Sequence, residues 1–193
     1  AKREEGRHVS FSSEVKEELS RQDTSARHCR LAELAAIIGM CGDVCISAME
    51  RYRLRIHTEN EAVARKCFTL LRKTFSINSD VSVHLHKRNG KGSQIYTLLI
   101  RDHAEVLRVL QALKLVDAAG EIQEQVSPAN QLLVQKSCCR RAFIRGAFLA
   151  AGSISNPEKS YHFEIVCVSP ERAEQLQALI RTFGLDAKTV QDR

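Results

Sequence analysis

One short segment of small and apolar residues occurs twice in this chain, and the two copies restrict the folds open to it. The first copy begins at Cys29 and the second at Cys139, 110 residues later. In each copy the small residues recur three or four positions apart, which places them on one face of a helix. These small residues are Ala32, Ala36 and Gly39 in the first copy, and Ala142, Gly146 and Ala150 in the second. Because such a face lets another backbone approach closely, the two helices are predicted to pack together at the centre of two pseudo-symmetric halves.

The residues that follow each copy predict a mixed α+β unit. Each helix is expected to end at a glycine, Gly42 or Gly152, and to continue into a strand. In the first half the pattern then predicts a second strand, a helix capped at Asn60 or Thr58, a hairpin, and a last helix opened by Asp102. The predicted order is helix, strand, strand, helix, strand, strand, helix.

The second half repeats only the beginning of this unit. A strand over 161–168 is predicted to precede a helix that Ser169 caps with Pro170 at its first position. The chain then stops where the first unit still has a hairpin and a helix to come. We therefore expect an N-terminal arm and short helix over 1–25, a first unit over 26–130 and a second, incomplete unit over 131–193, with the linker near 120–128.

Basic side chains gather on one predicted sheet face of the first unit. Strand residues alternate between two faces, so the strand over 51–58 points its arginines and His57 away from Leu54 and Ile56. In the hairpin, Val81, Val83 and Leu85 are predicted to face the core, its histidines to face away, and residues 87–92 to make the turn. The candidate DNA-binding residues are Arg51, Arg53, Arg55, His84, His86, Lys87, Arg88 and Lys91. The alternative is a solvated face that carries charge but binds nothing. The corresponding strand of the second half is less basic, because His162 and Glu164 stand in the positions of Arg53 and Arg55.

Composition and charge agree with an intracellular protein that has an anionic partner. The formal net charge is +6, and 44% of the 193 residues are hydrophobic, enough for a substantial core. No apolar run approaches the roughly 20 residues of a membrane span, and the first residues lack a signal-peptide core. Seven cysteines without a disulfide-like spacing predict reduced thiols. We expect a cytoplasmic, nucleoid-associated protein with no membrane contact.

Several long strings carry a resemblance to a known family. The repeated helix resembles the LAGLIDADG motif, which forms the paired central helices of homing endonucleases. Together with the strings over 11–19, 145–153 and 157–161, the chain resembles the WhiA family of bacterial sporulation and cell-division regulators from about Ser10 onward. That resemblance implies binding of double-stranded DNA, a possible partnership with another transcriptional regulator, and a C-terminal helix-turn-helix domain beyond this chain.

The residues depart from the nuclease motif where cutting chemistry needs them. Homing endonucleases of this fold hold divalent metal with one acidic residue at the end of each motif helix, because hard cations bind carboxylate oxygen. The corresponding residues here are Cys41 and Ala151, so no catalytic residues are assigned. Asp43, two residues after Cys41, has Ser153 as its counterpart. No cofactor is expected. A zinc site is not expected either, because Cys138 and Cys139 are adjacent and the other candidate ligands lie on different elements.

The sequence thus predicts a non-enzymatic DNA-binding transcriptional regulator of sporulation and cell division on a degenerate homing-endonuclease scaffold. One alternative is a protein-interaction platform whose DNA recognition lies wholly in the missing helix-turn-helix domain. The other is a nuclease that is still active, which would require a pair of carboxylates.

Overall fold

The computed structural model describes residues 9–49, 51–88, 91–116, 119, 121 and 132–191; the side chains of residues 87, 88 and 91 lie outside the described part. Its helices are α1 (Phe11–Arg21), α2 (Arg27–Cys41), α3 (Glu61–Phe75), α4 (His103–Ala112), α5 (Ser137–Ala151) and α6 (Pro170–Arg181). Its strands are β1 (Gly42–Ile46), β2 (Tyr52–Thr58), β3 (Asp80–Arg88), β4 (Lys91–Ile100), β5 (Gly152–Ile154) and β6 (Phe163–Ile165).

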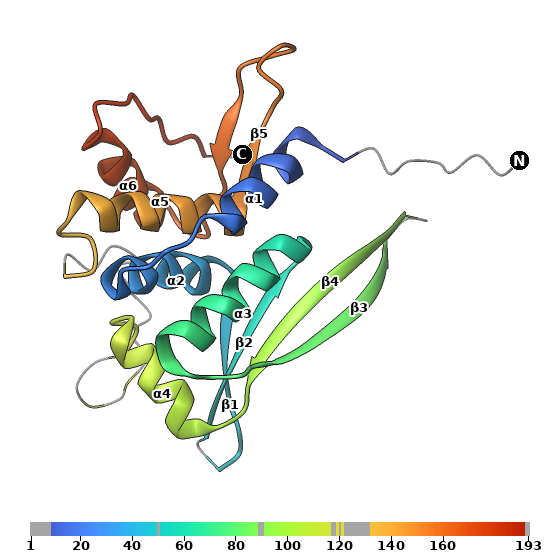
Figure 1. Ribbon diagram of the computed structural model, residues 1–193, viewed down its shortest axis with the longest axis vertical. Helices are drawn as coiled ribbons and strands as arrows, with labels where there is room; N and C mark the ends of the chain where they lie inside the picture. Colours follow the sequence, from blue (N-terminus) through green and yellow to red (C-terminus); the bar gives the residue numbers. More distant parts are fainter. Residues whose placement is uncertain are drawn as a thin grey trace, which may run out of the picture.

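The first unit runs α2, β1, β2, α3, β3, β4, α4, which confirms the predicted order of helices and strands. Its four strands form an antiparallel sheet in the order β1-β2-β4-β3. The helices lie on one side of this sheet, and the β3–β4 hairpin extends beyond them as an arm (Figure 1). The second unit, α5, β5, β6 and α6, has a short two-stranded sheet.

Local sequence sets the starts of helices α3, α4 and α6. The side chain of Asn60 accepts hydrogen bonds from the amides of residues 62 and 63, and Asp102 caps α4 through the amide of Glu105. Ser169 caps α6, with Pro170 as its first residue. These side-chain oxygens satisfy amide groups that have no partner within the helix, so the predicted caps are confirmed.

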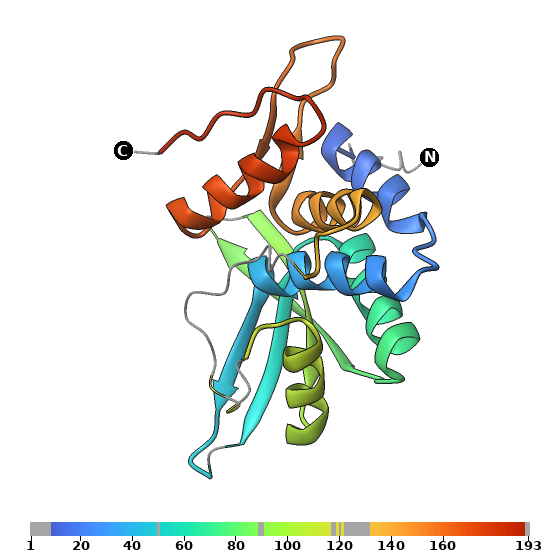
Figure 2. The same ribbon diagram turned by 90° about the vertical axis from the view of Figure 1, so that its left-hand side faces the viewer.

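Helices α2 and α5 pack against each other between the two units (Figure 2). A Cβ atom added at Gly146 of α5 would lie 2.4 Å from the backbone oxygen of Glu33 and 3.0 Å from the Cβ of Ala36. Only glycine permits so close an approach of α5 to the α2 backbone. The predicted close contact is therefore confirmed at Gly146 and Ala36. Gly39, also predicted on this face, takes no part in it, because an added Cβ there would meet nothing within 4 Å.

A buried charged cluster lies beside this contact. The carboxylate of Glu33 is fully buried, and Arg145 of α5 donates to both of its oxygens at 3.2 and 3.1 Å. Lys66 of α3 lies 3.7 Å from the same carboxylate, and the hydroxyl of Thr24 donates to it at 2.7 Å. Glu33 is thus bonded from the α1–α2 loop, α3 and α5 at once, which fixes the relative placement of these elements.

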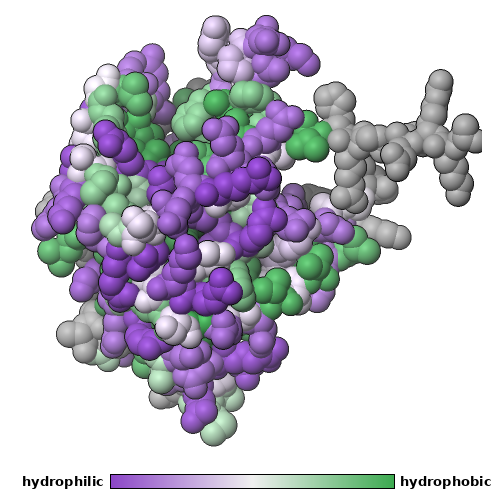
Figure 3. Space-filling model, viewed as in Figure 1, coloured by the Kyte–Doolittle hydropathy of each residue, from purple (hydrophilic) through white to green (hydrophobic). Residues whose placement is uncertain are grey.

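Three expectations about the strands are corrected. Val81, Val83 and Leu85 do not join the core: they are 51, 50 and 74% exposed, because their half of β3 extends beyond the helices, and Figure 3 shows hydrophobic surface along this arm. The hairpin strands reach Arg88 and Lys91, so these residues do not form the turn. The strand predicted over 161–168 is only Phe163–Ile165. The predicted linker near 120–128 lies almost wholly outside the described residues.

Candidate nucleic-acid interface

Two arginines stand free on the sheet face that the helices leave open. Arg53 and Arg55 are exposed residues of β2, while Leu54 and Ile56 between and beside them are buried under the helices. Within the described part of the chain, neither guanidinium has a hydrogen-bond or ion-pair partner among the protein's own groups. Both can therefore donate several hydrogen bonds to an external anion, and their geometry suits a phosphate.

Acidic groups reduce the positive charge at the edges of this face. Asp43 of β1 pairs in register with Arg55, and its carboxylate lies 3.3 Å from Nε2 of His57. At the other edge, the carboxylate of Asp80 accepts a 2.7 Å hydrogen bond from Arg101. Among the side chains that the structure describes on this face, the free positive charge is therefore concentrated on β2.

The remaining sequence-predicted residues are spread along the arm and the β1–β2 turn. His84 and His86 are exposed residues of β3, separated from β2 by the intervening strand β4. Arg51 is exposed just before β2, where its backbone oxygen accepts from the amide of Ser47. Lys87 and Arg88 end β3 and Lys91 begins β4, but their side chains lie outside the described part. The structure thus brings Arg53 and Arg55 together and leaves the histidines apart from them.

The second sheet offers no equivalent pair of free cations. His162 lies 3.1 Å from the carboxylate of Glu164, which also accepts a 3.0 Å hydrogen bond from Ser153. The hydrogen bond from His162 is the main cause that holds the pKa of Glu164 below its usual value. This sheet is therefore less basic than the first, as its sequence predicts.

Cys41 and Ala151 are the last residues of α2 and α5. Burial raises the pKa of the Cys41 thiol to about 11, so this group is protonated at neutral pH and is a poor ligand for a hard cation. Lys16 of α1 lies close by: it lines one shallow pocket with Ala151 and Gly152, and its amino group lies 5.8 Å from the ring centre of Phe148. A lysine at this end of the helix pair opposes the binding of a divalent cation.

Family models match most of the chain. The WhiA N-terminal LAGLIDADG-like domain matches residues 27–116, and the WhiA LAGLIDADG-like domain matches residues 140–193. The chain belongs to the WhiA family. It is 47% identical over 182 residues to a probable cell division protein WhiA from Lachnoclostridium phytofermentans, which covers 94% of this chain and 58% of the relative. A relative of the same name from Lachnospira eligens is 44% identical over 184 residues, covering 94% of this chain and 56% of the relative. The chain thus spans little more than half the length of these WhiA proteins.

Solved structures support the same fold. Full-length WhiA from Thermatoga maritima superposes with a TM-score of 0.65 at 22% identity, over 96% of this chain and 55% of that one. The homing endonuclease I-DmoI, solved in complex with DNA and Mn, superposes with a TM-score of 0.57 at 14% identity, over 87% of this chain and 85% of that one. At these identities the likeness shows the fold alone. It confirms a LAGLIDADG-type α+β architecture for this WhiA-family chain.

Sequence reasoning missed a group of side chains at the other end of the paired helices. His28 and Cys29 of α2 lie beside Cys138 and Cys139 of α5, and among the described residues they are the one group of three or more His, Cys, Asp or Glu side chains placed to share a metal ion. The adjacency of the two cysteines argued against such a site. The signal that could have found it is the repeat itself, because His28 and Cys29 precede Cys138 and Cys139 by the same 110 residues that separate the two helices.

No helix within the described ranges of this WhiA-family chain has the length and apolar character that crossing a membrane requires.

Proposed function

We propose that this chain is the DNA-binding, non-cutting part of a WhiA-type transcriptional regulator of cell division and sporulation, acting in the cytoplasm at the nucleoid. The relatives are named probable cell division proteins, and the homing endonuclease with the same fold was solved on DNA. In this proposal the part of the relatives that lies outside this chain supplies a helix-turn-helix domain and much of the sequence recognition.

The observation that carries the proposal is the pair of unpartnered guanidinium groups on the open face of β2. An arginine that already has a protein partner would lose that interaction on binding DNA, whereas Arg53 and Arg55 have none among the described residues. Phosphate contacts supply affinity without sequence information. Binding by this chain alone is therefore expected to be weak, salt-sensitive and largely non-specific.

The absence of cutting in this proposal follows from the ends of α2 and α5. Hydrolysis of a phosphodiester by this fold requires metal held by carboxylates from both helices. Cys41 offers a protonated thiol, Ala151 offers no ligand, and Lys16 adds a like charge. We expect supercoiled plasmid to remain intact with the chain and Mg²⁺ or Mn²⁺, and cleavage that depends on the protein would contradict this part of the proposal.

The DNA-binding part is tested by fluorescence anisotropy with a labelled duplex across a series of salt concentrations. The variant Arg53→Ala/Arg55→Ala should bind at least about 10-fold more weakly, and the slope of log affinity against log salt should become shallower by about 2, since each lost phosphate contact removes close to one unit. The matched control is Lys159→Ala/Lys188→Ala, which removes the same charge from exposed positions outside the sheet. If both double variants lose DNA affinity equally, the loss reflects net charge alone. That result would overturn the assignment of the DNA contacts to β2.

The exposed apolar residues of β3 favour a second function, a docking surface for another regulator. Val83 and Leu85 lie on the arm at 50 and 74% exposure, and exposed apolar patches commonly mark protein contacts. In the full-length protein this function predicts that Val83→Ser/Leu85→Ser abolishes regulation in cells while Arg53→Ala/Arg55→Ala leaves it intact. The DNA-binding proposal predicts the opposite: Arg53→Ala/Arg55→Ala impairs regulation in cells more than Val83→Ser/Leu85→Ser does.

A further inference from the structure

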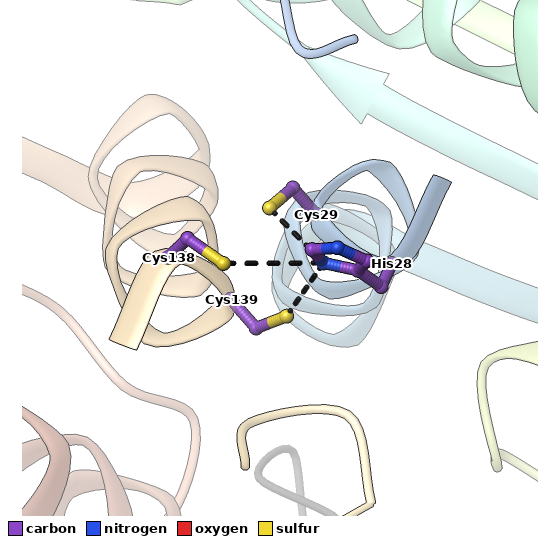
Figure 4. A group of neighbouring side chains, drawn as sticks. All are labelled: His28, Cys29, Cys138 and Cys139. Carbon is purple, nitrogen blue, oxygen red and sulfur yellow. Dashed lines mark hydrogen bonds between the residues drawn. The ribbon is translucent and has the colours of Figure 1, made fainter. Parts of the chain in front are cut away.

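Four side chains with metal-binding atoms converge where the paired helices begin. Nδ1 of His28 lies 3.1 Å from Sγ of Cys139, 3.3 Å from Sγ of Cys29 and 4.0 Å from Sγ of Cys138. All four donor atoms lie within 4.8 Å of one another. Figure 4 shows the imidazole of His28 on α2, with the three sulfur atoms gathered on the side of the ring that faces α5.

These separations are close to the edges of a tetrahedral zinc site. With Zn–S near 2.3 Å and Zn–N near 2.0–2.1 Å, ideal tetrahedral geometry separates two sulfur ligands by about 3.8 Å, and sulfur from nitrogen by about 3.6 Å. Of the observed nitrogen-to-sulfur distances, 3.1 and 3.3 Å are shorter than this sulfur-to-nitrogen separation and 4.0 Å is longer. One imidazole and three thiolates form one of the ligand sets that structural zinc sites use. Small rotations of the side chains would bring all four atoms to one ion.

The way the two helices begin also leaves room for negative charge at this place. Helices α2 and α5 both lack a side-chain cap and an acidic residue in the first turn. The other helices of the described part, α1, α3, α4 and α6, each have a side-chain cap and an acidic first turn. A helix N-terminus carries partial positive charge, which stabilises a nearby anion. The two uncapped N-termini meet at the cluster, where thiolates bound to a metal would supply the missing negative charge.

The ligands come equally from the two units. His28 and Cys29 are the second and third residues of α2, and Cys138 and Cys139 are the second and third residues of α5. Both ligands of each pair lie in the first turn of their helix, beside the facing helix. Two residues adjacent in sequence can therefore both reach the same ion. Cys139 is buried and Cys138 is exposed, so the cluster is anchored in the interface and open to solvent on one side.

We propose that His28, Cys29, Cys138 and Cys139 bind one Zn²⁺ ion that fastens the first unit to the second at the start of their paired helices. The ion has a structural role, since all four tetrahedral positions are filled by protein ligands. Hard cations such as Mg²⁺ do not suit this set, because thiolates are soft ligands. The site is independent of the proposed DNA contacts, which lie on the sheet.

The test uses the 193-residue chain, fully reduced and stripped of metal, with Zn²⁺ alone as the probe in a calorimetric titration. We expect one ion per chain and a higher midpoint of thermal unfolding with zinc. Co²⁺ in place of Zn²⁺ should give the visible bands of a tetrahedral ion together with a thiolate charge-transfer band. Cys29→Ser and Cys139→Ser should each weaken zinc binding by more than about 100-fold, because even the loss of outer-shell partners of a metal costs 10- to 100-fold.

The controls are Cys45→Ser and Cys167→Ser, which change partly buried cysteines outside the cluster and should leave one zinc per chain. Cys138→Ser alters an exposed ligand with little risk to folding, so it keeps the test valid if the buried variants do not fold. The proposal is overturned if the reduced chain binds no stoichiometric zinc, or if Cys138→Ser binds zinc as tightly as the parent chain. It is also overturned if two cluster cysteines form a disulfide and the chain still binds no zinc after that disulfide is reduced.

Discussion

At the scale of single residues, Gly146 is the position where the two units come closest. An added Cβ there would overlap the backbone oxygen of Glu33 at 2.4 Å, so Gly146→Val should force α5 away from α2 and destabilise the protein by about 1–3 kcal/mol or more. The matched control is Gly39→Ala, at a helical glycine whose added Cβ meets nothing within 4 Å. That change should stabilise by about 0.5–1 kcal/mol, because alanine loses less backbone entropy in a helix. Urea unfolding measures the free energy of unfolding of both variants. Equal changes in that free energy at the two sites would contradict the close packing at Gly146.

Glu33 shows which residue-scale features the sequence could not predict. In the sequence, Glu33 is a charged residue within an apolar helix, and no periodic pattern distinguishes a buried carboxylate from an exposed one. Its burial depends on Arg145, Lys66 and Thr24, which approach from other elements. The small residues around it were predictable, since their spacing alone places them on one helix face. Partners distant in sequence, here as in the His28 cluster, become visible only once the helices are paired.

At the scale of elements, the sequence predicted helix ends better than strand burial. Asn60, Asp102 and Ser169 cap the predicted helices because a cap depends on contacts two or three residues away. Strand alternation gives two faces but does not say whether anything covers them. The predicted candidate site shows the same limit: alternation correctly placed Arg53 and Arg55 on the open face of β2, but could not show that β4 separates them from His84.

The arm of β3 and β4 gives a prediction at the same scale. Leu85 of β3 is 74% exposed, whereas Leu98 of β4 is fully buried under the helices. We expect Leu85→Ala to change the free energy of unfolding by no more than about 0.5 kcal/mol, and Leu98→Ala to reduce it by about 2–5 kcal/mol. Chemical denaturation of the two variants provides the measurement. A large loss for Leu85→Ala would mean that the arm folds back onto the core in solution.

At the scale of the whole molecule, the two units share one hydrophobic core. Buried residues of the first unit, such as Ala36 and Ile37, belong to one cluster with Phe143 and Leu176 of the second. Polar bonds also cross between the units, among them the bond that Arg172 of α6 donates to the backbone oxygen of Gly39 and the 3.1 Å bond from Arg145 of α5 to the carboxylate of Glu33. The pseudo-symmetry of the chain therefore does not make its halves independent.

Separated halves should consequently fold only together. A fragment of residues 1–116 would expose the small face of α2, and a fragment of residues 132–193 would expose that of α5 along with Phe143, which is 1% exposed in the intact chain. Mixing the two fragments should restore helical circular dichroism and give a single complex on gel filtration, because each buries the apolar face of the other. Gly146→Val in the second fragment should weaken the complex, whereas Gly39→Ala in the first should not. A second fragment that folds alone, or two separate unfolding transitions in the intact chain, would show that the shared core contributes little to the stability of either unit.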